Sequence, residues 1–495
     1  MSIARKVLGN TVVQIAGRLF MAFLSIFIVK LITNYLGVEG YGRYAAIYEF
    51  LAFFGIAADL GLFTIGVREM AKEDSQEKRE YVLANIITLR MILCTVVMAI
   101  AIVSAYFIPQ YNDLHLGIAI ASIAVFLSII QSALASLLQL NLKMQYAALA
   151  QVAGKVVALS YMIYVAFYGF ANNVGDGFYH LIFAGVVGNV VLVFVTYLAA
   201  RKYGRIRFGT DFKYIRSVFV RCLPYGLALV LNMIYFRIGS IMLLLMQGPT
   251  EVGLYSVPMR ILEILSLVPV FFMNSVLPVL TRHIKEASSR VKDILKYSFD
   301  FLFMAAVPMV VGTFVLAYSL IFVISSEEFL SRIDEGFYGS DIVMKILMIA
   351  MMISFINNLF IYSIIATNHQ NKLLWINGSC AILNVCLNLF LIPQFGARGA
   401  AITAVLTEML LFVLAFSVAR RYLKFTFSFG TVWKVSLAGT LMGLSVWALR
   451  DISYSYIQNM NVLLLIPLGG VVYSGMLLLT KGIPKELLAL IRKSS

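Results

Sequence analysis

The stretch VVQIAGRLFMAFLSIFIVKLI, residues 12–32, decides the fold class of this chain. A helix needs about 20 consecutive apolar residues to cross the roughly 30 Å hydrocarbon core of a bilayer. This stretch reaches that length, and it is too long for the apolar region of a cleavable signal peptide. We therefore expect it to form the first membrane span.

Similar apolar windows recur along the 495 residues, of which 61% are hydrophobic and only 13% are charged. A soluble domain normally carries about 25% charged residues. The sequence therefore predicts an all-α polytopic membrane protein with about fourteen transmembrane helices. We expect them at residues 9–34, 41–67, 81–108, 114–138, 146–170, 178–200, 217–246, 252–281, 297–324, 341–367, 372–393, 398–419, 430–449 and 459–480.

The basic residues between these spans and at their ends predict the orientation. If the N-terminus is cytoplasmic, the cytoplasmic segments hold 26 lysines and arginines, and the outer connections hold four. Such a bias is the positive-inside signal of a membrane protein, so we expect both termini in the cytoplasm and the protein in the cytoplasmic (inner) membrane. The net charge of +15 is then explained by anionic membrane lipids, and no nucleic-acid partner is needed.

A weak internal repeat predicts two lobes. Residues 37–49 read GVEGYGRYAAIYE and residues 248–260 read GPTEVGLYSVPMR, and a shift of 211 superposes two glycines and one tyrosine. A similar outer turn without a repeated lobe would also explain the match. The predicted organisation is a six-helix lobe (1–200), a basic cytoplasmic linker (201–216), a second six-helix lobe (217–424) and a helix pair with a basic tail (425–495). Transporters with such repeats bind their substrates at the repeat interface.

Several charged residues lie deep in the predicted spans. A charge at the centre of a membrane helix costs at least about 2.5 kcal/mol, so such residues face a partner or a water-filled cavity. Five cations exceed the acids near them, and arginine binds phosphate oxygens in a bidentate manner. We interpret the cations as an anion-binding cavity and the acids as coupling or gating groups; structural pairing is the alternative. The cations are Arg18, Arg90, Lys155, Arg237 and Arg260, and the acids are Glu49, Asp59 and Glu263.

Two pairings are already visible in the sequence. Arg260 and Glu263 are one helical turn apart and can pair. Asp59 lies at a depth shared with Arg18, Arg90 and Lys155, so it is expected to partner one of these cations. The neutral amides of other spans, among them Asn357, are expected mainly to make hydrogen bonds between helices.

Motifs for chemistry are missing. The sequence has no GxxxxGK[ST] nucleotide-binding loop, no HExxH and no GxSxG, and its connections are too short for a catalytic domain. The four cysteines lack metal-ligand spacing. Transport is therefore favoured over catalysis, with no cofactor; coupling to H⁺ or Na⁺ stays open.

Three motifs in order resemble the polysaccharide-transporter or O-antigen flippase family of the multidrug/oligosaccharidyl-lipid/polysaccharide exporter superfamily. They are DLGL at 59–62 followed by RE at 68–69, GLY at 253–255, and IPQFGARGAA at 392–401. The resemblance covers nearly the whole chain. It implies 12–14 helices in two lobes that form a V-shaped transporter with a cationic central cavity.

The resemblance also implies a function. The family flips a lipid-linked oligosaccharide, such as an O-antigen repeat unit on a polyprenyl diphosphate, from the cytoplasmic to the outer leaflet. Arg18 and Arg260 fit the positions of cavity arginines in such flippases. Where the family often reads Y-x-R-x-D, this chain has Tyr235 to Gly239, so Arg237 is expected to lack a nearby carboxylate. Expected partners are the lipid-linked glycan, membrane lipids, a polysaccharide polymerase and glycosyltransferases, and the protein is expected to be a monomer.

Three alternatives stay open. A flippase for the peptidoglycan precursor lipid II also handles a diphosphate. A cation-coupled multidrug exporter of the same superfamily would need an acid-rich cavity. An integral-membrane glycosyltransferase or polymerase would need a large outer loop with carboxylates, and the acidic segment 325–340 is short for that role.

Overall fold

The computed structural model describes the backbone of residues 3–427 and 429–482, and it describes side chains there except at 3–16, 18–19, 224–225 and 227–236. The chain divides into two compact units, unit 1 (Met1–Gly253) and unit 2 (Leu254–Ser495). The described elements are helical, apart from one isolated bridge between Arg332 and Phe337. This agrees with the all-α class predicted from the apolar windows.

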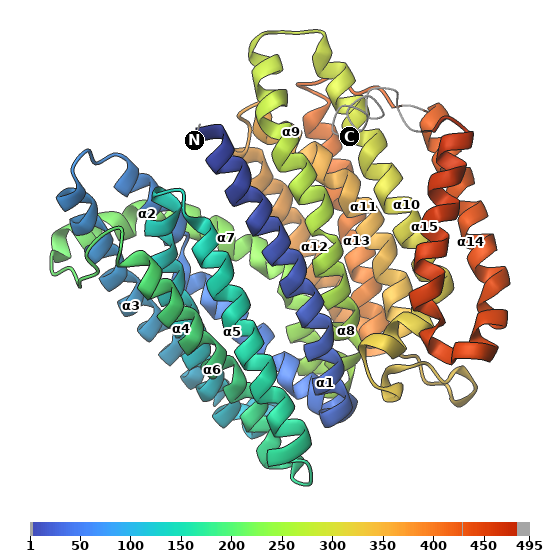
Figure 1. Cartoon of the computed structure of the whole chain (residues 1–495), viewed down its shortest axis with the longest axis horizontal. Helices are drawn as coiled ribbons and strands as arrows, with labels where there is room; N and C mark the ends of the chain where they lie inside the picture. The colour runs from blue at the N-terminus through green and yellow to red at the C-terminus, as the bar shows by residue number, and fades with distance from the viewer. Residues whose placement is uncertain (1–2, 428, 483–495) are drawn as a thin grey trace. The chain divides into compact units, whose positions relative to one another are not determined.

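Unit 1 contains a layer of long helices that pack along their lengths. α3 contacts α4, α4 contacts α6, and α6 contacts α5, while α1 and α7 contact each other (Figure 1). A buried apolar cluster that includes Met70, Leu83 and Leu138 joins α2, α3 and α4. The helices of this part are α1 (Ile3–Asp59), α2 (Leu62–Ala71), α3 (Gln76–Ala105), α4 (His115–Leu140), α5 (Met144–Tyr164), α6 (Val174–Ala200) and α7 (Phe212–Gln247).

Unit 2 contains a bundle with a helix pair packed on it. α11 contacts α10 and α13, α13 contacts α12, and the pair α14 and α15 packs on α10 (Figure 1). The pair shares a buried cluster with α10 that includes Val307, Ala438 and Leu465. The remaining helices are α8 (Pro249–Leu265), whose first five residues belong to unit 1, α9 (Leu267–Lys285), α10 (Arg290–Ile324), α11 (Ser340–Ala366), α12 (Asn371–Phe395), α13 (Ala397–Ala419), α14 (Phe429–Ile457) and α15 (Val462–Leu479).

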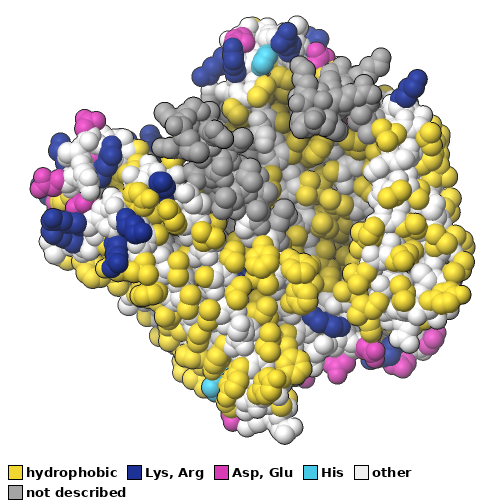
Figure 2. Space-filling view, in the orientation of Figure 1, with side chains coloured by type: hydrophobic (Ala, Val, Ile, Leu, Met, Phe, Trp, Pro, Cys, Tyr) yellow, Lys and Arg dark blue, Asp and Glu magenta, His cyan; other side chains and the backbone are white. Residues whose placement is uncertain are grey.

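The helix flanks are apolar, as a membrane requires. Eleven helical segments of the described chain are long and apolar enough to span a membrane. Two of them, Phe20–Ala71 and Phe429–Leu479, each hold more than one predicted span, so a count of fourteen is compatible with the structure. Hydrophobic side chains cover the visible flanks, and charged side chains gather at helix ends (Figure 2). The protein is therefore a multi-pass membrane protein.

The repeated turn has the same backbone conformation in both copies. Gly37 has φ 68° and ψ −171°, and Gly248 has φ 90° and ψ −176°; both values lie in a region that favours glycine. The second glycine pair meets across the repeat. A Cβ at Gly42 would clash with the carbonyl oxygen of Pro249, and a Cβ at Gly253 would clash with that of Val38. The residues of the two turns thus contact each other reciprocally, because Val38 and Pro249 are also related by the shift of 211.

Some predicted boundaries differ from the structure. The second span ends at Asp59, where Leu60 and Gly61 take positive φ angles of 44° and 73°, and the chain then forms α2. Arg68 and Glu69 therefore belong to a helix rather than to the loop expected at 68–80. The last part of the predicted linker 201–216 is helical as well, because α7 begins at Phe212. The division into lobes at 200 and 217 stays a prediction.

Candidate functional site: paired charges inside the helices

The deep charges fall on helices that pack together within their unit. Arg90 lies on α3, Lys155 on α5 and Arg237 on α7, while Glu49 and Asp59 lie on α1. Arg260 and Glu263 lie on α8, and Arg18 lies on α1, but the side chain of Arg18 is outside the described residues. The structure thus describes four of the five predicted cations.

Arg90 cross-links three helices. Its Nη2 lies 2.5 Å from Oδ1 of Asp59 on α1, and its Nη1 donates to Oγ of Ser132 on α4 at 2.7 Å. The Arg90 side chain is 1% exposed and that of Asp59 is 30% exposed. The guanidinium cannot reach a ligand without leaving this pair, so Arg90 has the geometry of a structural cross-link. The carboxylate is positioned by the left-handed turn that ends α1.

Arg237 also has a carboxylate partner, contrary to the prediction from Gly239. Its Nη1 lies 2.6 Å from both carboxylate oxygens of Glu49, which is 5% exposed. The partner comes from α1, which packs against α7, rather than from the arginine's own helix. The prediction was wrong because the family pattern describes only neighbours along one helix, whereas helix packing brings together residues 188 positions apart.

Lys155 contacts a hydroxyl group, and Arg260 pairs with a carboxylate on its own helix. The Nζ of Lys155 donates to Oγ of Ser25 on α1 at 2.5 Å. Arg260 pairs with Glu263 at 3.0 Å, as their spacing of three residues indicated, and their side chains are 32% and 37% exposed. Among the pairs of Arg90, Arg237 and Arg260, the last therefore has the most accessible side chains.

A buried polar network joins α11, α12 and α13 in unit 2. The Nδ2 of Asn357 donates to the carboxylate of Glu408 at 2.6 Å, and Asn384 donates to Thr407 at 3.2 Å. Asn388 donates to Asn384 at 2.8 Å. These are the hydrogen bonds between helices expected of the amides, but Glu408 was not among the predicted site residues. The signal available in the sequence was an acid inside an apolar span.

No metal centre is indicated by the residues present. Within the described ranges, no three His, Cys, Asp or Glu side chains are grouped so that they could hold a metal ion.

A family comparison identifies the kind of protein that carries these pairs. The model of a family described as "Polysaccharide biosynthesis protein" matches residues 4–284, more than half of the chain. The chain belongs to this family. The matched region holds every predicted site residue. A sequence search of curated proteins finds no match.

Solved structures show the same fold in transporters. A structure titled "Lipid II flippase MurJ, inward closed conformation" aligns with a TM-score of 0.70 at 15% identity, over 95% of this chain and 98% of that one. An inward-facing multidrug resistance MATE family transporter of the MOP superfamily aligns with a TM-score of 0.66 at 15% identity. The alignment covers 83% of this chain and 97% of that one. A MOP superfamily transporter from Pyrococcus furiosus aligns with a TM-score of 0.58 at 14% identity, over 84% of this chain and 95% of that one. Its title reports a binding pocket of reverse polarity. At these identities the likeness shows the fold.

Proposed function

We propose that the protein is a flippase that moves a polyprenyl-diphosphate-linked oligosaccharide, a repeat unit of a surface polysaccharide, from the cytoplasmic to the outer leaflet. Membership of the polysaccharide biosynthesis family and the transporter fold support this proposal. The charge bias of the connections supports cytoplasmic termini and a location in the cytoplasmic membrane. Transport by alternating access, without a catalytic step, accounts for the absence of catalytic motifs.

The observation that carries the proposal is the accessible arginine in α8. A diphosphate needs charge-assisted donors, which an arginine in a weakly hydrated environment supplies well. Arg260 keeps 32% of its side chain exposed, whereas Arg90 keeps 1%. Its partner Glu263 is a neighbour on the same helix, one turn away. We assign phosphate binding first to Arg260, then to Arg237, Lys155 and Arg18, and we assign gating to Glu49, Asp59 and Glu263.

A lipid II flippase is the second candidate, favoured by the similarity of fold over 95% of the chain to a protein with that title. Both candidates carry a polyprenyl diphosphate, so the same arginine serves either substrate. The attached sugars distinguish them. An exporter of organic cations is disfavoured, because the predicted site holds more cations than acids.

The test is translocation in vesicles that contain the purified full chain. A fluorescent lipid-linked oligosaccharide and fluorescent lipid II are supplied in separate arms, and arrival in the other leaflet is measured. Arg260→Gln is expected to slow translocation about tenfold or more, since a hydrogen bond to a charged group contributes about 1.5–3 kcal/mol. The matched control is Arg282→Gln on α9, which breaks an exposed pair with Glu286, the residue after that helix; the Arg282 side chain is 76% exposed.

Each arm has a clear outcome. Oligosaccharide translocation that falls in Arg260→Gln and not in Arg282→Gln supports the proposal. Faster translocation of lipid II than of the oligosaccharide would favour the second candidate. Equal rates for wild type and Arg260→Gln, at equal protein levels, would remove the arginine from substrate binding.

A further inference from the structure

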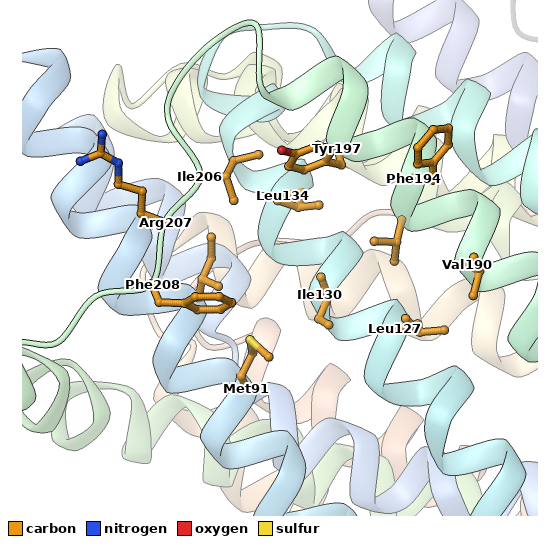
Figure 3. Close-up of a pocket in the computed structure, with 12 residues that line it drawn as sticks. Met91, Leu127, Ile130, Leu134, Val190, Phe194, Tyr197, Ile206, Arg207 and Phe208 are labelled. Carbon is orange, nitrogen blue, oxygen red and sulfur yellow. The ribbon is translucent and has the colours of Figure 1, made fainter.

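An apolar groove of about 510 Å³ opens between α3, α4 and α6 in unit 1. Its walls are aliphatic and aromatic side chains, among them Met91, Leu127, Ile130 and Phe194 (Figure 3). The volume lies within the roughly 300–1,000 Å³ range of small-molecule sites. Of the predicted substrate-binding cations whose side chains the structure describes, none lines it. The groove therefore shares no lining residue with those cations.

The groove has the length of an acyl chain. Tyr197 lies three residues from the end of α6, and Leu127 lies thirteen residues from the end of α4. At 1.5 Å per residue the groove reaches about 20 Å from the helix ends. Half of a hydrocarbon core is roughly 15 Å thick. The groove thus extends from the predicted cytoplasmic border through about one leaflet.

A strap, residues 204–211, closes one side of the groove. Ile206 and Phe208 turn towards the apolar side chains, while the guanidinium of Arg207 points away from them (Figure 3). The Tyr81 hydroxyl and backbone N–H groups lower the pKa of Asp211, so this anchor is ionised at neutral pH. The bonds that hold the strap to α3 are Arg205 N to Glu80 Oε1 (2.9 Å), Gly209 N to Ala84 O (3.0 Å), Gly209 N to Thr88 Oγ1 (2.9 Å), Asp211 N to Asn85 Oδ1 (3.1 Å) and Tyr81 Oη to Asp211 Oδ2 (2.5 Å).

Four cations follow the end of α6 along the chain, and one of them, Arg207, lines the groove. Arg201, Lys202, Arg205 and Arg207 are all outside the buried core, and they lie next to one another along the chain. Within the described part of the chain none of the four forms a salt bridge, in contrast to Arg221 on α7, which pairs with Glu69. An apolar slot with uncompensated positive charge at its border complements a lipid with an anionic headgroup.

We propose that this groove binds one acyl chain of an anionic glycerophospholipid, whose phosphate is held by the cations of residues 201–207. The lipid would pack α3, α4 and α6 against the strap at the predicted cytoplasmic border. It is a resident lipid and not the transported glycolipid. This inference does not depend on the proposed substrate.

The experiment uses quenching of tryptophan fluorescence by acyl-chain-brominated lipids in nanodiscs that hold the full chain. The three native tryptophans, Trp375, Trp433 and Trp447, lie in unit 2 and are replaced by Phe. Phe194→Trp then places a fluorophore in the groove. Leu149→Trp is the control, because it is 55% exposed on α5, five residues from the helix end, and Phe194 is six residues from the end of α6.

We expect the groove fluorophore to be half-quenched at about a fivefold lower fraction of brominated phosphatidylglycerol than of brominated phosphatidylcholine. The reason is that one lysine or arginine near the surface attracts anionic lipid by about 1 kcal/mol, which corresponds to about a fivefold difference in affinity. The control is expected to show no such preference. Arg205→Gln with Arg207→Gln should abolish the preference, and Arg290→Gln, an exposed cation of unit 2, should leave it unchanged. The charge variants alter only side chains outside the core, so they keep the fold.

Three results would overturn the proposal. The first is equal half-quenching by the two lipids in Phe194→Trp, and the second is a preference that survives loss of Arg205 and Arg207. The third is relief of quenching by undecaprenyl phosphate at lower amounts than by unbrominated phosphatidylglycerol, which would make the groove a substrate site instead.

Discussion

The ion pair between Arg90 and Asp59 gives the sharpest test of what the deep charges do. Asp59→Ala leaves a guanidinium that is 1% exposed, with Ser132 as its remaining hydrogen-bond partner within the described residues. Removing one partner of a buried pair typically costs about 3–5 kcal/mol. Because Asp59 is 30% exposed, water can reach that side, and we expect a loss of about 3 kcal/mol in the free energy of unfolding.

Replacing Arg90 instead of Asp59 is expected to lower the free energy of unfolding by a smaller amount. Arg90→Met keeps the apolar volume of the side chain and leaves Asp59, which is partly hydrated, with an unmade hydrogen bond worth about 1–3 kcal/mol. The double variant Asp59→Leu with Arg90→Met removes both charges, and such replacements are often neutral or stabilising by about 1–4 kcal/mol. The expected order of stability is therefore double variant, then Arg90→Met, then Asp59→Ala.

The assay is a double-mutant cycle on the purified protein in detergent, with unfolding followed by fluorescence and size-exclusion chromatography. The exposed pair of Arg43 and Glu39, with side chains 42% and 58% exposed, is the comparison cycle and should give about 0.3–0.5 kcal/mol. Translocation is measured on the same samples. Unchanged unfolding in all variants together with lost translocation would refute the structural reasoning and return Arg90 to the substrate site.

Three further changes test other contacts. Gly42→Ala is expected to destabilise the protein by about 1–3 kcal/mol, because its Cβ would meet the carbonyl oxygen of Pro249, whereas Gly312→Ala, with open space around it, should stabilise or leave it unchanged in the same thermal unfolding assay. Asn357→Leu should cost about 1–3 kcal/mol in that assay, because it removes a donor from buried Glu408, and the neighbouring Asn358→Leu should cost less. In a cysteine-free background, a membrane-impermeant maleimide should label Asp334→Cys in intact cells and Ser288→Cys only after permeabilisation; the opposite pattern would reverse the predicted orientation.

The sequence predicted the helical class well because span length depends on local composition alone. The glycines of the repeated turn were also recognisable, since positive φ angles near 68° and 90° favour glycine whatever surrounds them. The pair of Arg260 and Glu263 was predictable for the same reason, because both residues lie on one helical turn.

The partners of Arg90 and Arg237 were not predictable in this way. Asp59 lies 31 residues from Arg90, and Glu49 lies 188 residues from Arg237, so each pairing depends on how helices rotate and pack. The groove also depends on how helices pack, because its walls come from three helices and the strap. Depth in the bilayer showed that these charges need partners, but it did not show which ones.

The pairs of Arg90, Arg237 and Arg260 differ more in the exposed fraction of their side chains than in their depth in the bilayer. The exposed fraction therefore distinguishes their roles better. Opening the Arg90 pair exposes a guanidinium that joins α1, α3 and α4, so it loosens the packing of unit 1. Opening the Arg237 pair uncovers a glutamate that is 5% exposed. The Arg260 pair lies within one turn of one helix, and both side chains are already about one-third exposed. The proposed anionic substrate has to break such a pair in each transport cycle, so the exposed fractions support the proposed order of phosphate ligands, with Arg260 first and the less exposed Arg237 after it.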